Sequence, residues 1–288
     1  MTLWRADRGD DRVLPFTLAV SYLVLPFLLV AVVLLYLLPE RTDELFAWTI
    51  EPPLTAMFLG SAYVGGIWFF TQVVRLRRWH RVQYGFPAVV LFATLLGVAT
   101  ALHWDRFHHG HVSFVAWAVL YATTPFLALA ALLLNRPADP RTPETYDIGV
   151  PRPVRLVLGA AGAVALLVGL ALFVVPSVGV ELWAWELTPL TARVVGAVLT
   201  LPGAVDVWLF LDSRWSSFRW MFQAQLASLL LINAAWIVER DHLLWERPVT
   251  WLFVVGVVGA LVVYATLYAW CERPTRASAV DRGGPAVR

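Results

Sequence analysis

Histidine is concentrated in one short stretch of the chain, HWDRFHHGH, which runs from position 103 to 111. Four of the six histidines lie in it: His103, His108, His109 and His111. Neutral imidazole binds zinc, copper, nickel and iron, so this stretch could hold one metal ion or a haem iron. Asp105 could be a further ligand, or a partner that orients an imidazole. The stretch lacks the spacing of a metalloprotease helix, so the interpretation that we favour is a polar hairpin at a membrane surface.

One carboxylate, Asp206, interrupts the apolar stretch LPGAVDVWLF. Inside a membrane it would cost about 2–3 kcal/mol and should face other helices or water, which suits proton coupling. The alternative interpretation pairs its carboxylate with Arg214 or Arg219 near the membrane boundary. Neutral polar residues in other apolar stretches could line a path or join helices by hydrogen bonds, and the second use is commoner. The candidates of this kind are Gln72, Gln225 and Asn233.

The composition indicates which elements must carry these residues. Only 15% of the 288 residues are charged, 59% are hydrophobic, and the mean hydropathy is +0.69. A soluble domain keeps roughly 25% of its residues charged. Open strands would leave backbone groups unpaired in lipid, so apolar blocks of this length predict helices and an all-α, polytopic transmembrane bundle. Eight spans are predicted, near 13–38, 53–74, 86–103, 112–134, 154–175, 189–211, 218–238 and 249–271.

Arginine supplies all 22 basic residues, and its distribution predicts the orientation of the chain. Seventeen of the 22 fall in the N-terminal segment, the even-numbered connections and the C-terminal tail. By the positive-inside rule both termini are cytoplasmic and the histidine stretch is outside. The use of Arg in place of Lys indicates a high-GC genome, so we expect the cytoplasmic membrane of a bacterium. A net charge of +2 does not point to nucleic acid, and the single Cys271 excludes an intrachain disulfide and a cysteine-based metal site.

A constant offset of 136 residues aligns the two halves of the chain. Three matches carry the alignment: Pro-Leu-Thr-Ala at 53–56 and 189–192, Arg78-Trp79 and Arg214-Trp215, and Asp105 and Asp241. Each half has four spans, an even number, so we expect two parallel four-helix repeats related by an axis along the membrane normal. The second half keeps only the aspartate of the histidine stretch, which makes Asp105 and Asp241 candidates for a shared role. The predicted units are a first repeat at 1–134, a cytoplasmic Pro-rich linker at 135–153, a second repeat at 154–271 and a disordered tail at 272–288.

The run LLGVATALHWDRFHHGHVSFVAWAVLY resembles segments of multi-pass membrane proteins from high-GC bacteria, in which a His-x-Asp-Arg-Phe-His pattern ends a helix. The resemblance covers the second to fourth predicted spans. It implies a membrane topology and no particular activity. The matching residues are His103, Asp105, Arg106, Phe107 and His108.

Three classes of function follow from these features. The first is transport of a small solute or ion, with Asp206 as the proton-binding group and a path between the two halves. The second is a redox subunit that binds a metal or haem with the histidine stretch, and no other cofactor is indicated. The third is a non-catalytic scaffold or accessory subunit in the lipid bilayer, bound to another membrane protein or to a second copy of the chain. An enzyme is less expected, because the sequence offers no set of nucleophile, base and orienting group.

Overall fold

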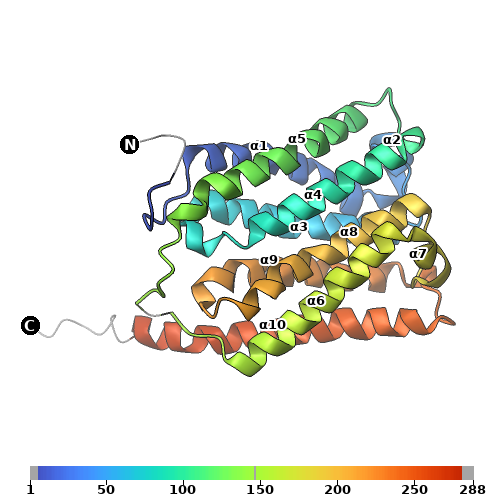
Figure 1. Ribbon diagram of the computed structural model, residues 1–288. Coiled ribbons are helices and arrows are strands. Elements are labelled where there is room, and N and C mark those ends of the chain that lie inside the picture. The colour runs from blue at the N-terminus through green and yellow to red at the C-terminus, as the bar shows by residue number, and fades with distance from the viewer. Residues whose placement is uncertain (1–5, 146, 281–288) are drawn as a thin grey trace, which may run out of the picture.

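The computed structural model describes residues 6–145 and 147–280, and this part of the chain is built from helices without a β-strand (Figure 1). The predicted all-α fold is confirmed. Two of the helices, α2 and α7, are short and lie in connections. The helices are α1 (Pro15–Val32, extended by a π-helical turn at Val33–Leu37), α2 (Thr42–Leu45), α3 (Pro53–Leu76), α4 (Gly85–Leu102), α5 (Val112–Asn135), α6 (Arg152–Val174), α7 (Pro176–Leu182), α8 (Pro189–Asp206, extended by a 3-10 turn at Val207–Phe210), α9 (Trp215–Val238) and α10 (Pro248–Val280).

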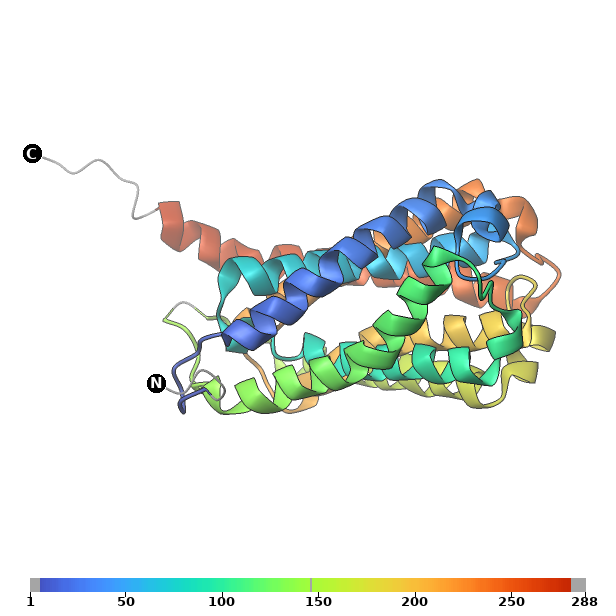
Figure 2. The same cartoon turned by 90° about the horizontal axis from the view of Figure 1, so that it is seen from above.

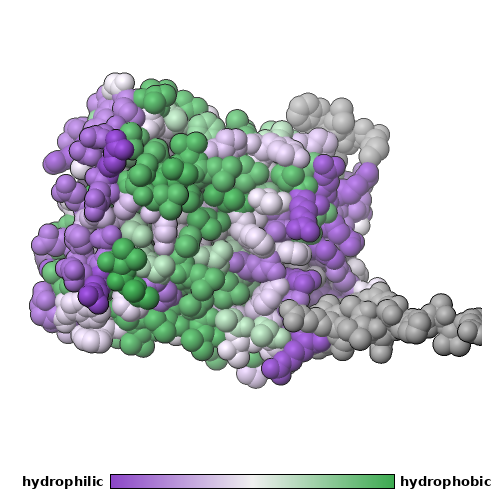
Figure 3. Space-filling model, turned by 180° about the vertical axis from the view of Figure 1, so that it is seen from behind, coloured by the Kyte–Doolittle hydropathy of each residue, from purple (hydrophilic) through white to green (hydrophobic). Residues whose placement is uncertain are grey.

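Eight of these helices are long and apolar enough to cross a membrane, so the chain is a multi-pass membrane protein. Figure 3 shows the corresponding surface, a hydrophobic band between two hydrophilic ends. The predicted spans agree closely with the observed ones. The spans are Pro15–Leu37, Pro53–Leu76, Gly85–Leu102, Val112–Ala138, Arg152–Val174, Pro189–Phe210, Trp215–Val238 and Pro248–Arg273.

The long helices run side by side along one axis, and the described chain starts and finishes at the same end of the bundle (Figures 1 and 2). We call this the terminal end. It also holds the connection between α3 and α4 and the segment that joins α5 to α6. The opposite end carries the stretch His103–His111 between α4 and α5, and we call it the histidine end.

The helices pack in pairs that correspond under the 136-residue offset. In the first half α1 packs on α3 and α4 on α5, and in the second half α6 packs on α8 and α9 on α10. Between the halves α3 packs on α9 and α4 on α8. A two-fold axis exchanges the members of such a reciprocal set, so this packing is compatible with the predicted repeat.

The contact between α6 and α8 is close because glycines face each other along it. A Cβ on Gly169 would lie 2.5 Å from the carbonyl oxygen of Gly196, and a Cβ on Gly203 would lie 2.5 Å from that of Gly162. No side chain fits there, and close backbone approach of this kind is a common way for helices to associate in lipid. This contact fixes α8, and with it Asp206 at the last position of the helix, against α6.

Two helices of the second half have polar features at one of their ends, namely the start of α8 and the end of α10. Helix α8 begins with a capping box, in which the Thr188 hydroxyl accepts a hydrogen bond from the backbone N–H of Thr191 at 3.2 Å. Helix α10 continues to Val280, beyond the predicted end of its span at 271 and into the segment expected to be disordered. Glu272 explains part of this extension, because its carboxylate is bound to α9 (below). Residues 281–288 of the predicted tail lie outside the described residues.

Candidate functional site

Asp206 is buried among four helices of the second half. The Tyr264 hydroxyl of α10 donates a hydrogen bond to its carboxylate Oδ2, and Nε2 of Gln225 on α9 approaches Oδ1 at 3.4 Å. Gly162 of α6 closes the remaining side, since a Cβ there would lie 2.6 Å from the Cβ of Asp206. Tyr264 lies 16 residues after Pro248, so the carboxylate is about 24 Å along α10 from the histidine end. The span of α10 ends at Arg273, nine residues after Tyr264, so the group is inside the membrane-spanning bundle and nearer to its terminal end.

The arginines that could have neutralised Asp206 are bound elsewhere. The guanidinium of Arg214 contacts Asp139 at 2.8 Å and Asp212 at 2.7 Å. Arg219 donates to Glu272 at 2.5 Å. The interpretation that paired Asp206 with one of these arginines is thus wrong, because the connections at the terminal end supply closer carboxylates. Among the described residues only uncharged groups donate to the Asp206 carboxylate.

A row of polar side chains leads from the terminal end to Asp206 along the contact between α9 and α10. Tyr264, Tyr268 and Glu272 are spaced four residues apart and so share one face of α10. Gln223 on α9 donates from Nε2 to the Tyr268 hydroxyl at 2.5 Å. Glu272 accepts hydrogen bonds from Trp215 Nε1 at 2.9 Å and from Arg219. We call this row, from Glu272 through Tyr268 and Gln223 to Tyr264, the α9–α10 polar row.

The Asp206 group has no counterpart in the first half. At the 136-residue offset, Asp206 corresponds to Phe70, and Gln225 and Tyr264 correspond to Val89 and Ala128. Phe70 and Ala128 are buried apolar side chains. The helix packing alone therefore does not require a carboxylate, an amide or a hydroxyl at these positions.

Of the other polar residues predicted inside the spans, Gln225 contacts Asp206, whereas Asn233 and Gln72 make no hydrogen bond to it in the described part of the chain. Asn233 donates to the carbonyl oxygen of Val257 on α10 at 3.3 Å and accepts from Trp236 Nε1 at 3.0 Å, so it links α9 to α10. Gln72 is buried in α3, and its Oε1 has no hydrogen-bond partner among the described residues. The same is true of the Oε1 of Gln225, which belongs to the amide whose Nε2 approaches the carboxylate of Asp206. The site thus contains one unused acceptor, which is unusual for a buried amide.

The four histidines of HWDRFHHGH point to different partners. His103 Nε2 lies 3.0 Å from Nη1 of Arg193, and burial together with this guanidinium lowers the pKa of His103. An unprotonated Nε2 accepts the hydrogen bond from the arginine. His108 is held by the Phe46 carbonyl oxygen at Nδ1, 3.0 Å away, and by the Thr49 hydroxyl at Nε2, 3.2 Å away. Both nitrogens of His108 are therefore occupied.

The remaining two histidines serve the start of α5. His109 packs its ring against Trp104 and Phe114, with centroids 5.1 and 4.8 Å away. His111 caps the helix, because its Nδ1 accepts from the backbone N–H of Ser113 at 3.2 Å. In the described part of the chain no group of three or more His, Cys, Asp or Glu side chains converges to hold a metal ion. The geometry gives the metal or haem hypothesis no support.

Asp105 and Asp241 occupy equivalent places on the surface of the histidine end. Each lies in a single 3-10 turn that follows a long helix. Their side chains are 77% and 96% exposed, and each is near the adjacent arginine, with closest contacts of 3.4 Å to Arg106 and 3.8 Å to Arg240. Exposed pairs of this kind contribute about 0–1 kcal/mol. Their exposure and weak pairing are typical of polar residues in a surface turn and do not indicate a binding site.

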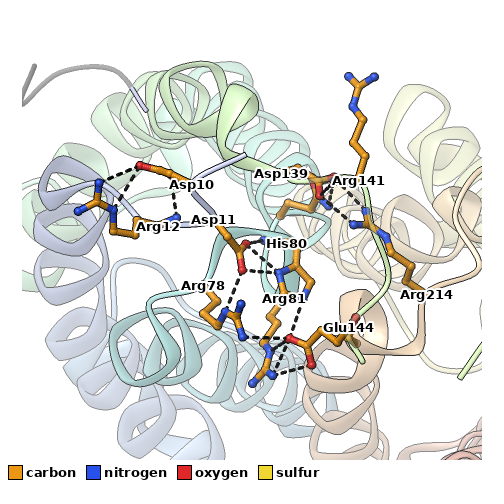
Figure 4. A network of polar contacts seen from close by, with 12 residues as sticks. Asp10, Asp11, Arg12, Arg78, His80, Arg81, Asp139, Arg141, Glu144 and Arg214 are labelled. Carbon is orange, nitrogen blue, oxygen red and sulfur yellow. Dashed lines mark hydrogen bonds and ion pairs between the residues drawn. The ribbon is translucent and has the colours of Figure 1, made fainter. Parts of the chain in front are cut away.

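A network of charged residues at the terminal end was not predicted (Figure 4). His80, with a side chain 2% exposed, lies between two carboxylates, Asp11 at 2.7 Å from Nδ1 and Glu144 at 3.0 Å from Nε2. Burial alone would lower the pKa of His80, but the two carboxylates outweigh it and raise that pKa. His80, with Arg81, lowers the pKa of Glu144 to about 2. This network joins the N-terminal segment, the connection between α3 and α4, and the segment between α5 and α6.

Two aspartates of this end form similar contacts 136 residues apart. Asp11 accepts from the backbone N–H of His80 at 2.9 Å and from its ring. Asp147 accepts from the backbone N–H of Ser216 at 2.8 Å and from its hydroxyl at 2.6 Å. The signal in the sequence was the pair Asp11 and Asp147, which share the offset of the predicted repeat.

The raised pKa of His80 predicts how the stability of this end depends on pH. A group whose pKa is higher in the folded protein stabilises it fully below its unfolded value of 6.5, and the contribution is lost as the pH rises through the higher folded value. The free energy of unfolding of the wild type should therefore exceed that of a His80→Gln variant most at pH 6 and below. The two pH profiles should converge at alkaline pH. Parallel profiles would contradict this assignment of charge to His80.

Comparisons with protein-family models, with curated proteins and with solved structures give no match to this chain.

Proposed function

We propose that this protein is a proton-coupled transporter of a small solute or ion, in which the carboxylate of Asp206 takes up and releases the proton. The observation that carries the proposal is a carboxylate buried inside the spans whose described hydrogen-bond donors are all uncharged. Ionisable groups in such places are costly, and they mark proton relays and ion pathways in membrane proteins. A purely structural hydrogen bond to Tyr264 would need only a neutral acceptor.

The surroundings of Asp206 suit a group that changes its protonation state. When it is charged, the Tyr264 hydroxyl and the Gln225 amide can stabilise it by donating hydrogen bonds. When it is protonated, it gains an O–H donor, and the unpartnered Oε1 of Gln225 is a nearby acceptor. The same two neighbours therefore serve both states, without a permanent counter-ion that would fix the charge.

The α9–α10 polar row supplies a route between Asp206 and one side of the membrane. The hydroxyl groups of Tyr264 and Tyr268 and the carboxylate of Glu272 follow each other along α10 at intervals of about 6 Å, and the Gln223 amide of α9 joins them at Tyr268. Glu272 is the member of the row farthest along α10 from Asp206, and it lies next to the arginine-rich terminal end. By the positive-inside rule we assign this end to the cytoplasm, with both termini there, and the membrane to the cytoplasmic membrane of a bacterium. Protons would then reach Asp206 from the cytoplasm.

Movement of one half of the bundle against the other would expose the site to each side of the membrane in turn. We interpret the two halves as parallel repeats, which is supported by the reciprocal packing of α3 on α9 and α4 on α8. A second set of contacts also recurs at nearly the same offset at the histidine end. The backbone N–H of His108 donates to Ala47, and that of Leu244 donates to Ala184, each at 2.9 Å. Transporters with such halves expose a site to one side and then the other by rocking motions.

The proposal is tested by proton movement in liposomes. Vesicles that contain the purified protein and an internal pH-sensitive dye receive a potassium diffusion potential, negative inside. Proton entry is followed with and without a panel of small ions and neutral solutes outside. Entry that depends on the protein, with at least one member of the panel, is the expected result. Entry equal to that of protein-free vesicles across the whole panel would contradict the proposal.

A further inference from the structure

A cavity of about 560 Å³ lies at the terminal end, between the N-terminal segment and the residues that follow α5. Three arginines line it, Arg8, Arg136 and Arg141, together with Gly9, Asp139 and two prolines. All three arginine residues are exposed, and none of their guanidinium groups forms an ion pair with another described residue. We call this cavity the arginine pocket. Its size is within the usual range of sites for small organic ligands, roughly 300–1,000 Å³.

Asp139 is the one acidic residue among those that line the pocket, and its carboxylate is paired with Arg214, which does not line it. Asp139 binds Nη1 and Nη2 of Arg214 at 2.8 and 2.9 Å and Nε2 of Gln83 at 2.9 Å. Burial alone would raise the pKa of Asp139, but these partners outweigh it and lower that pKa to about 2. Figure 4 shows the side chain of Arg141 extending away from Asp139, to which its backbone N–H is bonded at 2.9 Å. The lining of the pocket therefore carries excess positive charge.

The walls of the pocket are held in place by backbone hydrogen bonds. Ala6, Gly9 and Asp11 donate their N–H groups to the carbonyl oxygens of residues 134, 137 and 138, over 3.4, 3.0 and 2.9 Å. The N-terminal segment is thus fixed along the end of α5. The acidic residues of this segment, Asp7, Asp10 and Asp11, do not line the pocket. Asp10 pairs with Arg12 at 3.2 Å, and Asp11 pairs with His80. The three arginines are presented by a folded surface.

The pocket lies where the bundle leaves the apolar band. Arg136 is among the last residues of the span Val112–Ala138. A group bound there would be at the depth of lipid phosphates, and guanidinium groups suit phosphate because they combine charge with several hydrogen-bond donors. We propose that the arginine pocket binds a phosphate group, and that its position makes an anionic phospholipid headgroup the occupant. Basic pockets at the ends of spans bind lipid headgroups in this way.

The test measures lipid retention by the full-length protein. Purified protein is titrated with phosphatidylglycerol or phosphatidylcholine, and native mass spectrometry gives an apparent dissociation constant for each lipid. The pocket variant carries Arg8→Gln, Arg136→Gln and Arg141→Gln. The matched control carries Arg75→Gln, Arg152→Gln and Arg273→Gln, which remove the same charge from exposed arginines of the terminal end that do not line the pocket. A single Arg136→Gln variant repeats the measurement with one substitution, so that the test does not depend on the triple variant being folded.

We expect the wild type to bind phosphatidylglycerol more tightly than phosphatidylcholine. The pocket variant should lose at least about tenfold in affinity for phosphatidylglycerol, and Arg136→Gln should lose a few-fold. The control variant should bind like the wild type. Equal losses in the pocket and control variants would overturn the proposal, because they would show general attraction between charges. Displacement of phosphatidylglycerol by an equal concentration of inorganic phosphate would overturn the lipid as occupant.

Discussion

Asp206→Asn is expected to abolish proton entry that depends on the protein, with a loss of at least about 100-fold, the scale on which a single proton-transferring group contributes. Asparagine has nearly the same shape as aspartate and can still accept a hydrogen bond from Tyr264. It cannot bind and release a proton. Because Gly162 leaves no room for a larger side chain, this substitution also avoids steric strain. The measurement is the initial rate of dye response in vesicles with equal amounts of protein.

Two further variants make the result specific. Asp105→Asn removes the carboxylate of an exposed side chain in the turn after α4 and should leave the rate unchanged. Asp206→Glu restores a carboxyl group, although crowded against α6, and should recover part of the rate. The thermal unfolding midpoint of Asp206→Asn should be no lower than that of the wild type, since an ionisable group inside the bundle is replaced by a neutral amide of nearly the same size. Retained proton entry in Asp206→Asn would refute the role of Asp206.

Arg214→Gln is expected to lower the free energy of unfolding by about 3–5 kcal/mol. The guanidinium of Arg214 contacts two carboxylates, Asp139 and Asp212, and all three side chains are about 10% exposed. Removing it leaves two buried negative charges close to each other. Burial alone would raise the pKa of Asp212, but Arg214 outweighs it and lowers that pKa, so both carboxylates are charged at neutral pH. Unfolding in mixed micelles, followed by tryptophan fluorescence, measures the change.

The control for this prediction is the equivalent arginine of the first half. Arg78 also bonds to an aspartate, Asp11, at 2.8 Å, but its side chain is 51% exposed. Arg78→Gln should therefore lower the free energy of unfolding by at most about 1 kcal/mol. Equal losses in Arg78→Gln and Arg214→Gln would contradict the view that burial decides the effect.

The long helices could be predicted from the sequence because span length and hydropathy are local properties. The predicted span at 53–74 and the observed Pro53–Leu76 differ by two residues at one end. The short helices α2 and α7 were missed, since stretches such as PSVGVEL are too short for an apolar pattern to distinguish them from loops. Their helical form depends on the connections in which they lie.

Of the three residues of the candidate site, Asp206 and Gln225 were candidates from the sequence, and Tyr264 was not. Asp206 is conspicuous because it is a charge in an apolar stretch. Tyr264 is not, because a tyrosine in a span is common and its rotation toward α8 is set by tertiary packing. The charged network at the terminal end escaped prediction for the same reason, since Asp11 and His80 are 69 residues apart. The clustered histidines, in contrast, are conspicuous in the sequence but do not converge on one site among the described residues. Helix capping and ring packing direct neighbouring imidazoles to separate partners.

If Asp206 takes up and releases a proton inside the membrane, its carboxyl group must be protonated for part of the time and must exchange that proton with water. Dicyclohexylcarbodiimide tests it most directly, because this apolar reagent enters lipid and reacts with protonated carboxyl groups. After labelling in vesicles over a series of pH values, peptide mass spectrometry locates the adduct. We expect an adduct on Asp206 that becomes slower to form as the pH rises and that is absent from Asp206→Asn. Labelling of Glu272 without Asp206, or a rate on Asp206 independent of pH, would contradict it.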